Sequence, residues 1–207
     1  MKRNVRSVLL LTLACAALAA VPNLAQAQKI DIAFGISTIS APSANSANGN
    51  HNAASLDGGA YPGFSGDVLF LHNFGIGAEV FWKGSQGTYP ADIYGSGLNY
   101  RPVFYNFNAV YSAKVAPHIA FEAVGGIGAM DTHYSVCTFT GASSCGGSQL
   151  ISSSNHFDVD LGGGLKLYAR GGFFVRPEAR YYWINNNTDF SSNHATRYGV
   201  SIGYTFK

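Results

Sequence analysis

Residues 196–207 read TRYGVSIGYTFK, and this stretch decides the fold of the chain. Its apolar residues occupy alternate positions, and small or polar residues fill the positions between them: Tyr198, Val200, Ile202, Tyr204 and Phe206 form the apolar set. Because successive side chains of a β-strand point to opposite faces, the pattern predicts a strand with one apolar and one polar face.

The same alternation recurs in seven earlier segments, at 29–37, 64–71, 75–83, 98–111, 118–130, 156–168 and 173–184. The connections between them alternate in length. Those at 72–73, 112–117 and 169–172 are short, whereas those at 38–62, 84–97, 131–155 and 185–195 are long and rich in Asn, Ser, Gly and Thr. This rhythm is typical of a transmembrane barrel with short periplasmic turns and long extracellular loops. The sequence therefore predicts an all-β fold, an eight-stranded antiparallel up-and-down transmembrane β-barrel.

Alternation by itself is also typical of a soluble lipocalin-like barrel, which has its apolar side chains inside. Two features favour the membrane barrel. The polar faces are rich in Gly, Ala and Ser, which suit a narrow lumen better than a water-facing surface. Aromatic residues also gather at both ends of the strands, as in the two girdles of a membrane barrel. One group is Trp82, Tyr100, Phe157, Trp183 and Tyr198, and the other is Phe70, Phe74, Tyr111, Phe173, Tyr204 and Phe206.

The first residues resemble a secretory signal peptide. Lys2, Arg3 and Arg6 precede an apolar stretch at 8–21, and Ala25-Gln26-Ala27 supplies a small-x-small cleavage site. The apolar stretch is too short to cross a bilayer comfortably, and residues 12–15 are only a weak match to a lipoprotein site. We therefore expect a cleaved signal peptide at 1–27, a barrel domain at 28–207, and export to the bacterial outer membrane.

Composition agrees with this destination. Charged residues make up 12% of the chain, against about 25% in an ordinary soluble domain. Without Lys2, Arg3 and Arg6, the 13 Lys and Arg fall to 10 against 11 acids, so a basic surface for nucleic acid is not expected. Cys137 and Cys145 lie in the 131–155 loop and are predicted to form a disulfide in an oxidising compartment. A redox or metal pair lacks CxxC spacing or a His/Cys cluster, and no cofactor site is visible.

Charges on the polar faces would point into the barrel. They are Asp31, Asp67, Glu79, Lys83, Glu122, Asp158, Asp160, Lys166, Arg176, Glu178, Arg180 and Arg197. Asp31, Glu79, Glu122 and Glu178 fall a few residues into four strands of one direction, which predicts a belt of carboxylates at similar depth. Opposite charges in a poorly hydrated lumen must pair. The set therefore predicts a salt-bridge plug that closes the barrel, with a gated path for small ions as the alternative. Eight strands enclose a space that side chains just fill, which favours the plug.

Several stretches resemble the small outer-membrane β-barrel family of the OmpA transmembrane-domain and OmpX type. They are residues 100–108, 125–129, 162–166, 173–181 and the last strand, and the resemblance covers 28–207. It implies outer-membrane lipid and lipopolysaccharide as surroundings, a monomer, and assembly by the barrel-assembly machinery. Tyr204 and Phe206 resemble the signal that this machinery reads, although Lys207 follows the Phe.

His133-Tyr134-Ser135 resembles the His-x-Ser pair of a lipid A deacylase barrel. That family has Asn after the Ser and a Glu further on that orients the His. Here Val136 follows, and residues 137–155 contain no Asp or Glu. A Ser–His pair without an orienting acid is a weak nucleophile. The sequence therefore predicts a non-enzymatic barrel with a structural or surface-interaction role through its extracellular loops. A narrow ion or small-solute channel is the first alternative, and a lipid A-modifying enzyme is the second.

Overall fold

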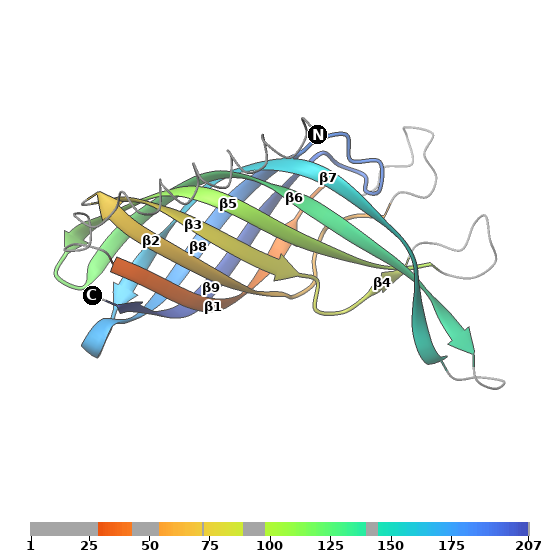
Figure 1. Cartoon of the computed structure of the whole chain (residues 1–207), viewed down its shortest axis with the longest axis horizontal. Coiled ribbons are helices and arrows are strands. Elements are labelled where there is room, and N and C mark those ends of the chain that lie inside the picture. Colours follow the sequence, from red (N-terminus) through yellow and green to blue (C-terminus); the bar gives the residue numbers. More distant parts are fainter. Residues whose placement is uncertain (1–28, 43–53, 72, 89–97, 140–144, 207) are drawn as a thin grey trace, which may run out of the picture.

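The computed structural model describes residues 29–42, 54–71, 73–88, 98–139 and 145–206 (Figure 1). The expected signal peptide and its cleavage site lie outside these residues. The strands are β1 (Lys29–Ser40), β2 (Tyr61–Leu71), β3 (Phe74–Trp82), β4 (Gly87–Thr88), β5 (Asn99–Ala116), β6 (Ile119–Phe139), β7 (Cys145–Tyr168), β8 (Phe173–Ile184) and β9 (His194–Phe206). One short 3₁₀ turn, η2 (Arg170–Gly172), precedes β8. Within the described ranges, no helix has the length and hydropathy needed to cross a bilayer.

The long strands form a closed antiparallel ring in the order β1-β2-β3-β5-β6-β7-β8-β9, with β9 paired back to β1. The short β4 adds to the edge of β5 beyond the end of β3. The eight-stranded antiparallel barrel that the sequence predicts is therefore confirmed. Following paired residues from Ile30 once around the ring leads to Ser40 on the same strand, an offset of ten residues. Such an offset requires the strands to tilt against the barrel axis.

The connection between β6 and β7 differs from the expected long loop at 131–155. Most of it continues both strands, and the resulting hairpin extends past the rim of the barrel (Figure 1). Thr132, Tyr134 and Val136 are β-branched or aromatic residues, which favour extended backbone. The pairing places Cys137 opposite Ser148 and Cys145 opposite Phe139. Their side chains are outside the described set, so the disulfide stays a prediction.

A proline interrupts the barrel wall between β7 and β8. The pairing runs to Gly164 opposite Glu178 and resumes at Leu167 opposite Val175 without a change of register. Pro177 lies within the gap. Because proline has no N–H, it cannot complete the ladder at this point.

The two faces of the wall differ as the alternation requires. Apolar side chains on the outer face are exposed on every long strand, among them Ile32, Phe64, Ile76, Phe107, Ile127, Leu161, Val175 and Ile202. Outward-facing Phe157, Trp183 and Tyr198 are also exposed near the long-loop end. Tyr100 is the exception to the expected girdle, because it is in phase with the inward Phe104 and only 5% exposed. Its assignment to the outer aromatic group is wrong.

Candidate functional site: a filled barrel lumen

The lumen contains buried ion pairs, and one group of them centres on Lys166. Its ammonium lies 2.5 Å from Asp31 Oδ2, contacts Glu122 Oε2, and lies 3.9 Å from Asp67 Oδ2. Arg176 contacts two of the same carboxylates, with Nη1 2.7 Å from Glu122 and 3.4 Å from Asp67. All five side chains are buried. Two cations thus hold three carboxylates inside the barrel.

A second group surrounds Glu79, nearer the long-loop end. Arg180 Nη1 donates to Glu79 Oε1 at 2.9 Å, and Arg197 Nη2 donates to Glu79 Oε2 at 2.9 Å. The Tyr182 hydroxyl also donates to Oε1 at 3.0 Å. Asp160 lies 3.3 Å from the same Arg180 nitrogen. Glu79 therefore has three buried donors, which compensate the loss of its hydration.

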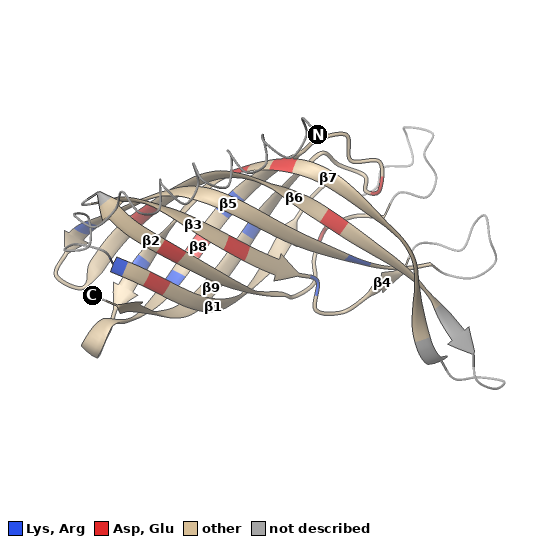
Figure 2. Ribbon diagram, viewed as in Figure 1, with Lys and Arg blue, Asp and Glu red and all other residues tan. Residues whose placement is uncertain are grey.

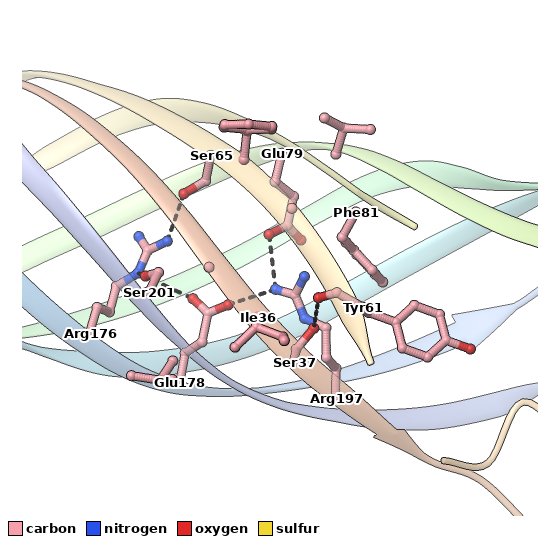
Figure 3. Close-up of a pocket in the computed structure, with 15 residues that line it drawn as sticks. Ile36, Ser37, Tyr61, Ser65, Glu79, Phe81, Arg176, Glu178, Arg197 and Ser201 are labelled. Atoms are coloured by element: carbon pink, nitrogen blue, oxygen red, sulfur yellow. Dashed lines mark hydrogen bonds and ion pairs between the residues drawn. The ribbon is translucent and has the colours of Figure 1, made fainter. Parts of the chain in front are cut away.

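Glu178 connects the two groups into one network. Its Oε2 lies 3.2 Å from Arg176 Nε, and its Oε1 accepts from Arg197 Nη2 at 2.8 Å (Figure 3). Figure 2 shows the acidic and basic positions interleaved along the neighbouring strands that supply the network. The sequence identified these side chains because each is in phase with a polar strand face.

The depths of the carboxylates differ from the expected single belt. Asp31 and Glu122 belong to the first group, Glu79 belongs to the second, and Glu178 lies between them. Their positions along the strands are the reason, because Asp31 and Glu122 lie two and three residues after the first residues of β1 and β6, whereas Glu79 and Glu178 lie five residues after those of β3 and β8.

Two of the expected lumen charges lie outside this network. The Lys83 ammonium lies 5.1 Å from the centroid of the Tyr100 ring, beyond the end of β3, and burial lowers its pKa. Asp158 is fully buried and accepts a hydrogen bond from Asn106 Nδ2. In the part of the chain that the structure describes, neither has an oppositely charged group within 4.0 Å. Strand alternation places Lys83 and Asp158 on the lumen face, but it does not indicate which groups they contact.

An aromatic plug, absent from the sequence-based expectations, fills the lumen beyond Glu79. Phe81 and Phe104 stack with centroids 4.6 Å apart, and the Tyr182 ring lies 5.7 Å from Phe81. The Arg197 guanidinium lies 4.1 Å from the Phe81 centroid, so the plug rests directly on the charge network. Phe81 is two residues after inward Glu79, and Phe104 is two residues before inward Asn106. Extending the alternation by one step would have placed both rings inside.

Two loops close the plug at the long-loop end. Leu56 and Phe190 are buried in the same apolar cluster as the aromatic plug, and Ala54 pairs with Phe190 in an isolated bridge. Phe190 also contacts Tyr100, with ring centroids 5.4 Å apart. These contacts join segments that are distant in sequence, so no local pattern indicates them.

Little space remains among the charged side chains. A cavity of about 20 Å³ lies beside Arg176, Glu178 and Arg197. It has room for about one water molecule. A small apolar cluster of Leu69, Val110 and Val124 lies toward the short-turn end. Along the described residues, side chains fill the lumen from this cluster to the loop cap.

The same geometry bears on metal binding. Oxygens of Asp31, Asp67 and Glu122 lie within 4.8 Å of one another, a spacing that a metal ion could bridge. The Lys166 ammonium occupies this position instead and contacts all three carboxylates. The lysine thus takes the place that a cation would need.

The His-x-Ser sequence does not form a nucleophilic pair. His133 Nε2 lies 3.3 Å from Asp131 Oδ2, whereas Ser135 Oγ accepts from Gln86 Nε2 at 3.4 Å. No hydrogen bond joins His133 to Ser135 in the described ranges. No Asp or Glu occurs at 137–155, after Ser135. The acid that contacts His133 is instead Asp131, which precedes it.

A second His–acid contact anchors a loop. His156 Nε2 lies 2.9 Å from Asp189 Oδ2, and the Ser154 hydroxyl donates to the same oxygen. Both donors belong to β7, and Asp189 precedes the buried Phe190. The three side chains therefore hold the loop cap against the β6–β7 hairpin, and the serine is bonded to the acid rather than to the histidine.

A family model described as the outer membrane protein beta-barrel domain matches residues 11–206. The chain belongs to this family. Among solved structures, a major outer membrane protein from Thermus thermophilus is similar at 10% identity and TM-score 0.60, covering 87% of this chain and 100% of that one. Neisserial surface protein A is similar at 11% identity and TM-score 0.53, covering 86% and 97% of the two chains. Ail, the attachment invasion locus protein of Yersinia pestis, is similar at 12% identity and TM-score 0.50, again covering 86% and 97%.

No curated protein matches the sequence. Identities this low show the fold alone, and one barrel fold can host unrelated functions. Membership of the family places the protein in the bacterial outer membrane, surrounded by its lipids. The short turns are therefore periplasmic and the long loops extracellular.

Proposed function

We propose that this protein is a non-conducting, non-enzymatic outer-membrane barrel that acts through contacts of its extracellular loops. The observation that carries the proposal is the filled lumen. The buried ion pairs around Lys166 and Glu79, the stacked Phe81 and Phe104, and the loop cap with Phe190 follow one another along the barrel. Ions would have to cross a charged layer and an apolar layer in series. This arrangement favours the plug over the narrow channel.

The β6–β7 hairpin supports contact with a surface. Before Phe157, whose carbonyl accepts from Asn185 N, the described residues of β7 have no backbone pairing on the β8 side, so this part of the strand edge is free. Leu150 and Ile151 on this edge strand are 61% and 57% exposed. A free edge can accept another strand, and exposed apolar side chains add burial energy on contact. We infer that the hairpin engages apolar surfaces or exposed strands of other cell-surface proteins.

Adhesion of whole cells tests this role. Cells that display the protein should adhere to polystyrene and to one another several-fold more than cells with Leu150→Ser and Ile151→Ser together. Val115→Ser is the matched control, because Val115 is 64% exposed but lies at the periplasmic end. Equal adhesion of wild type and the double variant, at equal surface amounts, contradicts the proposal.

Conductance measurements test the proposal that the barrel is non-conducting. Purified wild-type barrel in planar bilayers should give no stable single-channel currents. Long-lived open events in the wild type would favour the channel. Release of fatty acid from lipopolysaccharide, lost in Ser135→Ala, would favour the enzyme.

We also infer from the last strand that the barrel-assembly machinery inserts the protein into the membrane. Tyr204 and Phe206 face outward with ring centroids 4.8 Å apart, and Tyr204 also packs against Phe173 at 4.8 Å. These rings present a continuous aromatic surface at the end of β9. We expect Phe206→Ser to lower the amount of folded protein in the outer membrane, as judged by heat-modifiable gel mobility.

A further inference from the structure

The periplasmic end of the barrel is basic. The turns at 112–118 and 169–172 contain Lys114, His118 and Arg170 but no Asp or Glu, and β1 begins at Lys29. The first acid beyond Lys29 is Asp31, whose carboxylate is bound by Lys166 inside the barrel. These turns therefore provide no carboxylate to neutralise the positive charge at the periplasmic mouth of the barrel.

Strand alternation directs these groups toward the barrel axis. Lys29 is two residues before inward Asp31, and Lys114 is two residues after inward Ser112. Both lysines and His118 line a cavity of about 540 Å³ at the mouth. This volume lies in the range of small-molecule sites.

The rest of the cavity is aromatic and glycine-rich. Tyr168 forms part of its wall, and the Tyr168 hydroxyl accepts from Thr205 Oγ1 at 3.3 Å. Gly171 and Gly172, with φ of 72° and 93°, complete the wall in a backbone conformation that side chains rarely adopt. In the described part of the chain, neither Lys29 nor Lys114 lies within 4.0 Å of a carboxylate. Among the described residues, the two ammonium groups thus line a concave space with no carboxylate within 4.0 Å of either of them.

We propose that this periplasmic vestibule, the cavity lined by Lys29, Lys114, His118 and Tyr168, binds a phosphate group. A tetrahedral oxyanion accepts hydrogen bonds from several directions, which suits donors that come from different strands and turns. Phe173 and Tyr204 lie on the outer side of the same end, and aromatic rings there sit at the level of lipid headgroups. The phosphate therefore belongs either to an anionic phospholipid of the periplasmic leaflet or to a small soluble phosphate compound.

Amide chemical shifts of the barrel in phosphatidylcholine nanodiscs provide the test. One arm titrates glycerol 3-phosphate into the buffer, and the other replaces part of the lipid with phosphatidylglycerol. We expect saturable shifts confined to residues 112–118 and 168–172 in at least one arm. Saturation in the first arm identifies a soluble phosphate, and saturation in the second alone identifies the lipid headgroup.

Variants distinguish a specific phosphate site from nonspecific electrostatic attraction of anions to a basic surface. Lys29→Gln with Lys114→Gln should weaken the saturating response at least tenfold. Lys83→Gln removes one positive charge at the extracellular end and should leave the response within twofold. Gel mobility and amide spectra establish that each variant is folded. Shifts that never saturate in either arm, or that persist unchanged in the double variant, overturn the proposal.

Discussion

Lys166 shows how a single residue determines the state of the lumen. Its ammonium is shared by Asp31, Asp67 and Glu122, all of which are buried. A buried ion pair adds little net stability against an apolar pair, but loss of one partner leaves a desolvated charge. Lys166 therefore matters mainly because it neutralises three buried carboxylates, and less because its ion pairs add net stability.

Lys166→Met should destabilise the barrel by about 3–5 kcal/mol, because Asp67 and Glu122 would then depend mainly on Arg176 and Asp31 would lose its ammonium partner. The measurement is equilibrium urea unfolding in lipid vesicles, followed by tryptophan fluorescence. Lys114→Met, at the exposed periplasmic mouth, is the control and should change stability by less than about 0.5 kcal/mol. Similar midpoints for the two variants would show that the lumen hydrates the carboxylates.

Among the strands, β8 carries an identifiable defect. Pro177 lies in the stretch where β7 and β8 lose their pairing, although the register continues on both sides. In a bilayer, an unsatisfied backbone carbonyl has no water to bond with. The missing hydrogen bond at Pro177 therefore lowers the stability of the barrel wall.

Pro177→Val should restore a donor to the ladder and raise the stability by about 1 kcal/mol. Slower hydrogen exchange at Leu165 and Lys166 should accompany the change. Ala179→Val, which adds bulk to the same outer face without adding a donor, should leave that exchange unchanged. Unchanged exchange in Pro177→Val would place the missing bond elsewhere.

The free edge of β7 makes a second prediction about an element. Amides at 148–156 that point away from β6 have no strand partner, whereas those at 159–164 lie within the ring. Exchange should therefore be several orders of magnitude faster in the first stretch. Uniform protection along β7 would indicate that the edge is covered, for example by a second copy of the chain.

Strands and inward charges could be predicted because both follow from local alternation. Glu79 and Arg180 are each in phase with small residues on a polar face, and this pattern needs no knowledge of neighbours. The inward position of Tyr100 follows from the same rule, because Tyr100 is four residues before inward Phe104, whereas its place near a strand end predicted the girdle. Partners such as Glu178 with Arg197 depend on register, which no single strand specifies. Insertion of Phe190 is a contact between distant loops, and sequence pattern carries no signal for it.

At the scale of the whole molecule, the charge network and the aromatic plug are two barriers in series. The network connects strands around the ring through Lys166, Arg176 and Glu178. The plug then covers its upper surface, where Arg197 lies against Phe81. Barriers in series must both be removed before ions can pass. The two barriers also contact each other, because Arg197 pairs with Glu178 and lies against Phe81, so their contributions to stability are coupled.

Removal of one barrier at a time should therefore leave the barrel closed. Glu178→Ala breaks the link within the network, and Phe104→Ala removes one of the stacked rings at a cost of about 3–5 kcal/mol. Each single variant should melt at a lower temperature in detergent, yet conduct no more than wild type in planar bilayers. The double variant should be less stable than either single variant and should show brief open events. Conductance in Glu178→Ala alone would mean that the aromatic plug does not seal the lumen, and the closure would then have to be assigned to the ion pairs.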